Sequence, residues 1–182
     1  MQRIAKIDAA TAPARTAELL AAVKQKMGGV PNILATMAAS PAALAGYLGL
    51  SGALGEGRLD ARMRERIALA VAGANRCDYC ASAHSAIGSM VGLSKAEIEA
   101  SLTGRAEDAD AGIMLGLVTR IVQQGGLVSD ADLAAVRAAG HDDETIVEIV
   151  ANVALNIFTN YFNHIAGTDI DFPLVSTDSV AA

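Results

Sequence analysis

Helix start and stop signals recur at short intervals along this chain, and they constrain its fold more than any other feature. Ser, Asp or Ser-Pro precedes stretches with helical apolar spacing, and glycines follow them. No segment shows the sustained alternation of apolar and polar residues that indicates a strand. We therefore predict an all-α fold, with helices over about 11–27, 32–39, 41–54, 61–75, 78–91, 94–102, 107–124, 131–139 and 144–163.

Three expectations concern the ends of these segments. Asn32 is of a residue type that caps helix N-termini, and Gly140 of the type that ends helices. Ser94 and Glu97 have the spacing of a capping box. Residues 167–182 have no helical period, and we expect them to wrap a neighbour or fray.

Composition agrees with packed helices. Hydrophobic residues make up 52% of the chain and charged residues 19%, which is enough for a sizeable core, yet there is no Trp and only three Phe. Abundant Ala favours closely packed helices over a β-sandwich. A length of 182 residues favours a single domain over 1–182. It would comprise N-terminal helices (about 11–55), a central part (about 60–124), and C-terminal helices with a tail (about 129–182).

The charge and the terminal sequence exclude several classes of function. A net charge of −6 without a Lys/Arg run argues against nucleic-acid binding. The N-terminus has no apolar core of a secretory signal, and the apolar runs are interrupted too early for a membrane span. Two cysteines without an export signal indicate a reducing compartment. We expect a soluble, cytoplasmic protein.

The segment "RCDYCASAHSAIG" contains both cysteines of the chain. On one helix, Cys77, Cys80 and His84 point the same way. Such a pair near a helix N-terminus can close a disulfide, and the thiolate pKa falls near a helix N-terminus or a histidine. Cys77 has the better position for the helix dipole, whereas Cys80 has His84 as its i+4 neighbour. The spacing favours redox chemistry without deciding which cysteine attacks first.

Other interpretations of this segment stay open. Zinc could use the two cysteines and His84, with a fourth ligand from Glu65, His141 or His164. Two buried cysteines acting as small apolar residues are the simplest alternative. Glu65 lies at the edge of a buried region or is only a favourable charge near a helix N-terminus.

The last long helix is apolar nearly all round but carries a polar stripe. The stripe recurs every four residues at Glu148, Asn152, Asn156, Asn160 and His164. Buried amides need partners. A subunit interface or the wall of a polar pocket could supply them, and we favour the interface.

The segment "ERIALAVAGANRCDYCASAH" resembles a known signature. It is similar to that of the carboxymuconolactone decarboxylase superfamily, in its AhpD-like alkylhydroperoxidase branch, where a Glu precedes C-x-x-C-x-x-x-H by a fixed spacing. Glu65, Cys77, Cys80 and His84 match its four positions. "GGVPNILATMAASPAAL" and "TNYFNHIAGTDIDFP" are similar to uncharacterised peroxidase-related members, so the resemblance covers most of the chain.

The resemblance implies an AhpD-like helical bundle, assembled as trimers or hexamers, with thiol peroxidase activity and no metal or other cofactor. The cysteine matching Cys80 attacks the peroxide, Cys77 resolves the sulfenic acid to a disulfide, and Glu65 and His84 relay protons. A dithiol reductant, of lipoyl type in this family, then restores the thiols. Tyr79 replaces a histidine of the characterised type; its phenol shuttles protons poorly at neutral pH but could donate a hydrogen bond to a peroxide oxygen.

Two further functions remain as alternatives. A lactone decarboxylase of the same superfamily needs proton transfer but no cysteine pair. A non-enzymatic helical oligomer could sense redox state or bind zinc through the same segment.

Overall fold

A computed structural model describes residues 2–179, and over these residues the chain is all-helical, as predicted. The described part contains no strand. Its helices are α1 (Ala14–Met27), α2 (Asn32–Met37), α3 (Pro41–Gly55), α4 (Ala61–Ala74), α5 (Asp78–Met90), α6 (Lys95–Leu102), α7 (Ala109–Gln124), α8 (Asp130–Ala138), α9 (Asp143–Ala166) and a 3₁₀ turn, η1 (Thr177–Ser179).

Capping side chains explain most of the helix starts. The capping box at α6 is present in both directions: the Ser94 hydroxyl accepts from the Glu97 amide, and the Glu97 carboxylate accepts from the Ser94 amide. Asp60 caps α4 in the same manner, through the Met63 amide at 2.7 Å. These bonds satisfy amides that have no partner inside the helix.

The prediction that Asn32 caps α2 is wrong. The cap position is Pro31, and Asn32 is the first helical residue. Its backbone amide donates to the Asp171 carboxylate at 2.8 Å, and its side-chain amide donates to the Asp169 carbonyl at 2.9 Å. Residues near the C-terminus therefore supply the partner that the helix start lacks.

Two C-terminal boundaries differ from their predictions by a few residues. The C-cap of α8 is Ala139, and Gly140 follows it with φ of 96°. Helix α9 continues to Ala166, three residues past the predicted end at Asn163, and stops at Gly167, whose φ of 59° is the left-handed conformation that glycine tolerates best.

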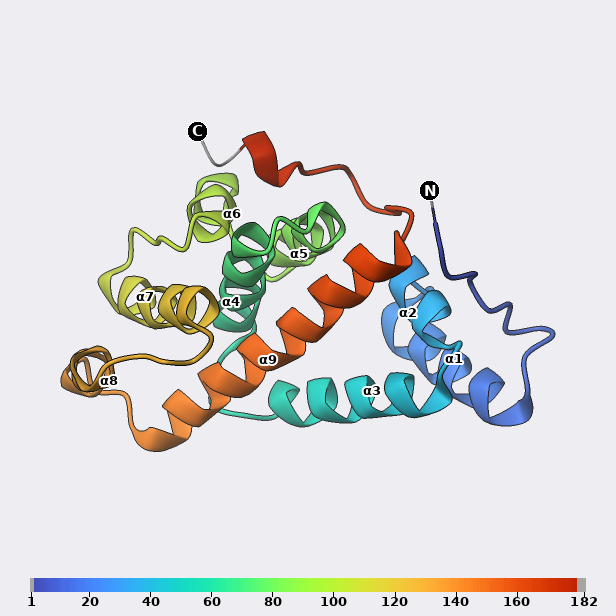
Figure 1. The fold of residues 1–182 in the computed structure, drawn as a ribbon, viewed down its shortest axis with the longest axis horizontal. Helices are drawn as coiled ribbons and strands as arrows, with labels where there is room; N and C mark the ends of the chain where they lie inside the picture. Colours follow the sequence, from blue (N-terminus) through green and yellow to red (C-terminus); the bar gives the residue numbers. More distant parts are fainter. Residues whose placement is uncertain (1, 180–182) are drawn as a thin grey trace.

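Helix α4 lies at the centre of the bundle, and α9 crosses it diagonally (Figure 1). Helix α4 contacts α5, α6, α7 and α9. One apolar core lies between α4, α7 and α9 and includes the fully buried Ile67, Leu115 and Ile149. Burying a side chain of this kind stabilises the fold by roughly 1.5–3 kcal/mol. Another core joins α1, α2 and α3, and a third joins α4, α5 and α6 around the two cysteines.

Gly73 permits the close approach of α4 to the end of α6. A Cβ atom at this position would lie 1.9 Å from the Leu102 carbonyl oxygen. Because that neighbour is backbone, it cannot move aside without separating the two helices. This approach fixes the end of α4, from which the chain turns into the cysteine helix.

Residues 168–179 pack against α5 of the same chain and do not fray. The Thr177 amide and hydroxyl both donate to the Asp78 carboxylate at 2.8 Å, and the Val175 amide donates to the Ser82 hydroxyl at 2.9 Å. The remainder of the predicted tail, residues 180–182, lies outside the described residues. The start of α5 is therefore held by the C-terminal segment.

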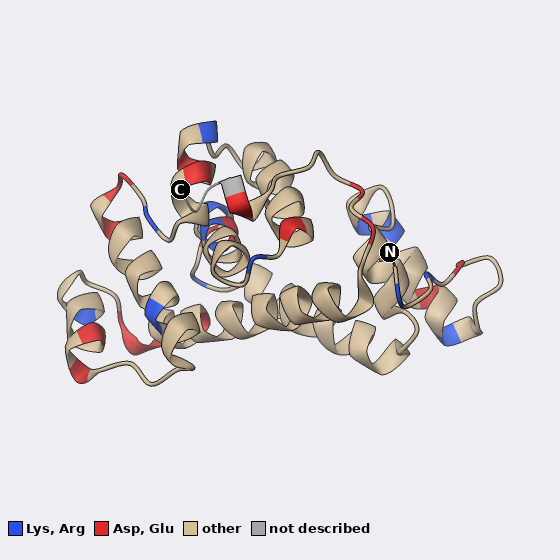
Figure 2. Cartoon of the chain, turned by 45° about the horizontal axis from the view of Figure 1, so that its top comes forward, with Lys and Arg blue, Asp and Glu red and all other residues tan. Residues whose placement is uncertain are grey.

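Helix α9 is the one described helix that is long and apolar enough to cross a membrane by length and composition alone. Beyond its first turns it carries almost no charge (Figure 2). However, α9 contacts α3, α4, α5 and α7 and contributes to the core beside α4. The buried face of α9 is thus used in packing between helices.

Most of the polar stripe of α9 finds hydrogen-bond partners within the described chain, although the side-chain nitrogen of Asn160 is buried without one. Glu148 accepts from the Arg58 and Leu59 amides, and the Asn152 and Asn156 amides donate to carbonyls one turn earlier. Both asparagines also line a cavity next to the cysteine helix. The pocket-wall alternative therefore holds for these two residues.

Candidate functional site

A tight turn between α4 and α5 places both cysteines at the start of α5. Arg76 adopts a left-handed conformation, with φ of 53°, which is unusual for a residue with a side chain. The turn closes with a bond from the Cys77 amide to the Ala72 carbonyl at 2.9 Å. Cys77 then occupies the N-cap of α5, and Cys80 lies in its first turn.

The two sulfur atoms lie 2.6 Å apart as free thiols. Both residues are 2% exposed. The Cys77 sulfur accepts from the Cys80 amide at 3.3 Å, and the Cys80 sulfur accepts from the side-chain amide of Asn163 at 3.2 Å. Sequence reasoning missed Asn163, which lies one helical turn beyond Asn160 of the polar stripe and 83 residues from Cys80.

The environment divides the thiol pKa values between the two cysteines. The hydrogen bond between the two thiols lowers the pKa of Cys77, despite the opposing effect of burial, and the bond from the Cys80 amide lowers it further. The same bond, together with burial, raises the pKa of Cys80, while Asn163 acts to lower it. In the reduced resting state, Cys77 is thus the better thiolate and Cys80 holds the proton.

Glu65 and His84 form a half-buried ion pair. Glu65 Oε2 lies 2.7 Å from His84 Nδ1, with side-chain exposures of 16% and 22%. Burial acts against the charged imidazole, but the charge and hydrogen bond of Glu65 outweigh it, so the pKa of His84 is raised. Glu65 thus lies at the edge of a buried region, and it leaves Nε2 as the ring nitrogen that can act on a substrate.

Cys80 and His84 both line a small cavity of about 60 Å³, which we call the chamber. Asn163, Thr159 and Tyr79 contribute its polar groups. The rest of its lining is mainly apolar: Met27, Pro31, Ile33, Leu34, Tyr47, Ala83, Ile87 and Phe172. The chamber can hold a small reacting group between a thiol and an imidazole.

Tyr79 has a different environment from the one expected. Its hydroxyl donates to Asp171 at 2.8 Å and accepts from the Ile33 amide at 3.1 Å. Burial raises its pKa, and its ring meets Phe172 edge to face at 5.8 Å. Because its one hydroxyl proton is already donated, the structure does not support a hydrogen bond from Tyr79 to a peroxide; the side chain instead holds Phe172 and α2 over the chamber.

A separate cavity of about 220 Å³ is lined by Cys77, and we call it the Cys77 cavity. Cys77 lines this cavity but is absent from the lining of the chamber, whereas Cys80 lines the chamber alone. Its other lining residues are Arg76, Asp78, Tyr79, Asn163, His164, Gly167, Thr168 and Ile170.

The structure gives no support to the zinc alternative. Across residues 2–179, no three or more His, Cys, Asp or Glu side chains are grouped so that they could hold a metal ion. His141 Nε2 lies 2.7 Å from Asp110, and His164 Nε2 lies 2.9 Å from the Asn75 carbonyl. The proposed fourth ligands thus have other partners.

A larger cavity lies away from this chemistry. It measures about 440 Å³ and lies between α4, α6 and α7, with Thr103, Arg105, Thr119 and Gln123 among its lining residues. No cysteine or histidine lines it. We therefore place the candidate site at the chamber.

The all-helical bundle and the dithiol beside a Glu–His pair agree with the AhpD-like arrangement that the motif resemblance implies. Residues 38–120 match the model of the carboxymuconolactone decarboxylase family. The match includes Glu65, both cysteines and His84. The resemblance predicted from the motif is confirmed.

Solved structures extend the likeness to nearly the whole chain. An alkylhydroperoxidase AhpD core, an uncharacterised peroxidase-related protein from Ralstonia eutropha JMP134, is 26% identical with a TM-score of 0.85; the alignment covers 93% of this chain and 92% of that one. A peroxidase-related protein from Silicibacter sp. TM1040 is 25% identical with a TM-score of 0.78, over 86% and 85%. These likenesses support a peroxidase-related role at the level of the family.

The same fold also occurs in a protein of different activity. The debrominase Bmp8, in complex with 2,3,4-tribromopyrrole, is 16% identical with a TM-score of 0.79, over 100% of this chain and 96% of that one. At this identity the likeness concerns the fold alone. No curated protein matches the chain.

Proposed function

We propose that this protein is a thiol-dependent peroxidase that reduces hydroperoxides with Cys80, Cys77, His84 and Glu65. The observation that carries the proposal is the chamber, because it brings the Cys80 thiol and the His84 ring to one small cavity while Glu65 holds the other side of that ring. A nucleophile and a proton donor on either side of a reacting group are what O–O cleavage requires.

The proposed reaction balances with the groups present and one external dithiol. The Cys80 sulfur attacks a peroxide oxygen, so an S–O bond forms, the O–O bond breaks, and the alkoxide leaves as an alcohol with a proton from His84. The Cys77 thiolate then attacks the Cys80 sulfur; the S–S bond forms and the oxygen leaves as water. The two thiol protons thus end on the alcohol and the water, and an external dithiol reduces the disulfide by exchange.

Two observations bear on which cysteine attacks. Electrostatics favours the thiolate on Cys77 in the resting pair, whereas geometry places Cys80 at the chamber. At 2.6 Å the sulfurs are close enough to exchange the proton directly, and Asn163 stabilises a thiolate on Cys80 once it forms. We therefore assign the attack to Cys80 and resolution to Cys77.

Sulfenic acid trapping in single-cysteine variants tests this assignment. Cys77→Ser treated with one equivalent of cumene hydroperoxide and then dimedone should gain one dimedone adduct, located at Cys80. Cys80→Ser should gain none and should lose peroxide turnover, while wild-type protein should lose both thiols and about two mass units as the disulfide forms. Turnover that survives in Cys80→Ser would refute the assignment, and carbon dioxide release from a muconolactone in both variants would favour the decarboxylase alternative.

We also propose that the protein acts as a homo-oligomer. Helix α9 presents an exposed apolar stripe on one face, to which Val147, Phe158, Tyr161 and Ile165 contribute. Exposed apolar surface of this extent is typical of an interface between proteins.

A further inference from the structure

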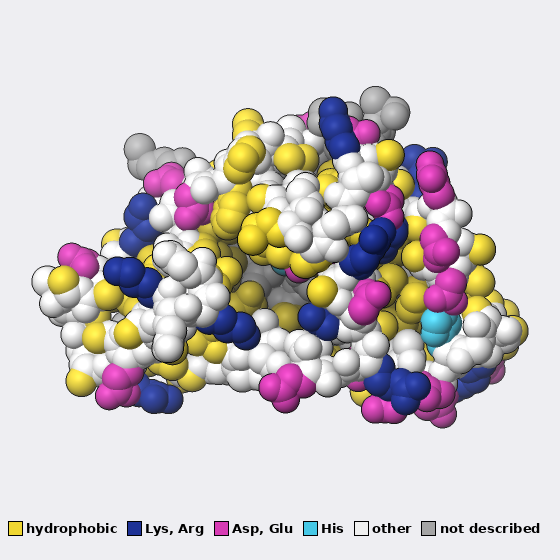
Figure 3. Space-filling model, turned by 180° about the vertical axis from the view of Figure 1, so that it is seen from behind, with side chains coloured by type: hydrophobic (Ala, Val, Ile, Leu, Met, Phe, Trp, Pro, Cys, Tyr) yellow, Lys and Arg dark blue, Asp and Glu magenta, His cyan; other side chains and the backbone are white. Residues whose placement is uncertain are grey.

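A second, more polar cavity of about 220 Å³ adjoins the chamber, and we call it the vestibule. Both cavities are lined by Met27, Leu34, Tyr47, His84 and Ile87. The vestibule lies between α1, α3, α4, α5 and α9, and the back face of the molecule is hollowed there, with basic side chains on either side (Figure 3). A molecule that reaches the chamber through the vestibule therefore passes those charges.

The two basic residues of the vestibule are Lys26 and Arg64. Among the described residues, no carboxylate pairs with either of them; Arg64 donates one bond to the Leu59 carbonyl and retains further N–H donors. Other arginines of the described chain, such as Arg58 and Arg120, do bind carboxylates. The vestibule thus has two cations whose charges no other side chain neutralises.

The single carboxylate among the described residues lining the vestibule does not cancel these charges. It belongs to Glu65, which is bound to His84 at 2.7 Å. When His84 is protonated, the pair is neutral overall, and Lys26 and Arg64 leave a net positive charge. Tyr47, Ser51 and Asn152 add uncharged polar groups. The vestibule therefore favours an anion, whereas the chamber favours an apolar group.

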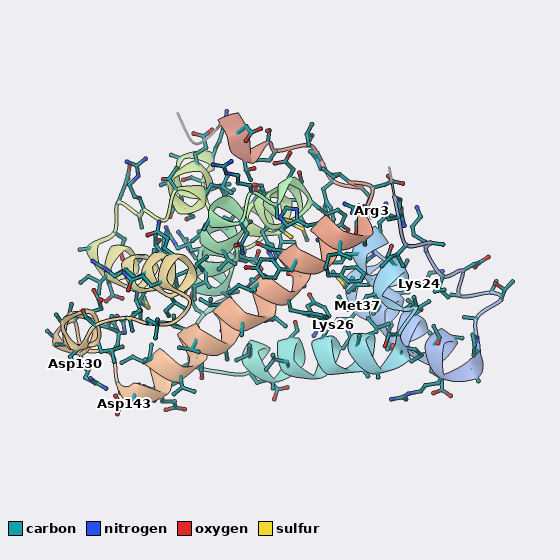
Figure 4. The ribbon with its side chains drawn as sticks, in the orientation of Figure 1. Arg3, Lys24, Lys26, Met37, Asp130 and Asp143 are labelled. Carbon is teal, nitrogen blue, oxygen red and sulfur yellow. The ribbon has the colours of Figure 1, made fainter. Side chains whose placement is uncertain are left out.

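The neighbouring Lys24 provides a comparison for Lys26. Lys24 and Lys26 both lie in the last turn of α1, where a cation is favoured by the helix dipole. Lys26 lines the vestibule, and its label falls in the space between α9 and α3 (Figure 4); Lys24 does not line it. Lys24 is thus a matched control, with the same charge and the same helix turn.

We propose that Lys26 and Arg64 bind the carboxylate of an amphipathic organic hydroperoxide whose apolar, peroxide-bearing end enters the chamber. This inference rests on the proposed peroxidase function and specifies its substrate class. The carboxylate would stay in the vestibule, where water reaches it, and the apolar part would lie against residues such as Leu34, Ile87 and Phe172. The two ends of the substrate would thus fit the two environments.

Two compact hydroperoxides that differ only in charge test the proposal. They are 4-(2-hydroperoxypropan-2-yl)benzoate and its methyl ester, assayed with excess dithiothreitol. The quantity compared is the ratio of kcat/KM for the anion to kcat/KM for the ester. A substitution that changes the reactivity of the thiols alters both values by the same factor and leaves this ratio unchanged. In wild-type protein the ratio should exceed that of the uncatalysed reaction with free thiol, and added salt should lower it.

The variants locate the effect. Lys26→Glu should lower the ratio about 5- to 10-fold, as expected for reversing one partly solvated charge, and Lys26→Gln should lower it less. Lys24→Glu should leave it unchanged. An unchanged ratio in Lys26→Glu, or an equal fall in Lys24→Glu, would overturn the proposed carboxylate site. Continued turnover of the ester in these variants would still support the peroxidase function. Failure of wild-type protein to consume either compound or to form a disulfide would overturn both.

Discussion

Removing the amide of Asn163 should slow the reaction with peroxide while leaving the fold nearly intact. In Asn163→Ala, the Cys80 sulfur loses the hydrogen bond that it accepts at 3.2 Å. A bond to a charged group in a buried site contributes about 1.5–3 kcal/mol, which corresponds to a rate change of about 10- to 100-fold. Asn160 also acts to lower the Cys80 pKa and remains, so we expect about a tenfold loss.

The same structure predicts a small effect on stability. The Asn163 side-chain oxygen is buried without a hydrogen-bond partner, so its removal ends an unfavourable desolvation. That gain offsets part of the cavity and the lost bond, and we expect the free energy of unfolding to change by only about 1 kcal/mol. Asn156→Ala is the matched control, since Asn156 is a buried asparagine on the same helix whose amide binds a backbone carbonyl.

Stopped-flow measurement of the first half-reaction, with iodoacetamide alkylation followed across pH, separates these effects. The rate constant with peroxide should fall about tenfold in Asn163→Ala, and the alkylation profile should shift to higher pH. The pH profile of alkylation in Asn156→Ala should match that of the wild-type protein. A wild-type rate in Asn163→Ala would refute the reasoning, as would a tenfold loss in both variants.

Two further predictions concern the ion pair and the α9 stripe. Glu65→Gln should move the alkaline limb of the pH–kcat/KM profile to lower pH, because it removes the charge that raises the His84 pKa. Because the pKa of His84 is higher in the folded than in the unfolded protein, its protonation stabilises the fold at a pH below the unfolded pKa. This stabilisation is lost as the pH rises through the folded pKa, so Glu65→Gln should lower the Tm more at about pH 5.5 than at about pH 8.5. Wild-type protein should sediment as an oligomer; Phe158→Glu should shift it toward the monomer, and an unchanged sedimentation coefficient would place the interface elsewhere.

Much of the fold could be predicted from the sequence because the helix ends are local features. Ser94 and Glu97 bind each other's amides within one turn, so their spacing was sufficient to predict the start of α6. Asn32 shows the limit of such reasoning. Its partners, Asp169 and Asp171, lie more than a hundred residues away, and no local pattern indicates that they occupy its amides.

The candidate site divides in the same way. Cys77, Cys80 and His84 lie within one short segment, and a motif was sufficient to group them. Asn163 reaches Cys80 through the crossing of α5 and α9, which the sequence does not encode as a spacing. The sequence allowed the Tyr79 hydroxyl to donate a hydrogen bond to a peroxide oxygen. Its partner in the structure, Asp171, comes from the C-terminal segment, which has no regular period from which its path could be predicted.

The position of the two cysteines between different cavities has a consequence for the catalytic cycle. Cys80 borders the chamber and Cys77 borders a separate cavity, so each cysteine lines a cavity that the other does not. An oxidant that arrives on one side leaves the other side open to a thiol that attacks the Cys77 sulfur of the disulfide. In the proposed cycle the hydroperoxide and the reducing dithiol would therefore use different cavities. Steady-state kinetics with both varied should then give parallel double-reciprocal lines without mutual substrate inhibition.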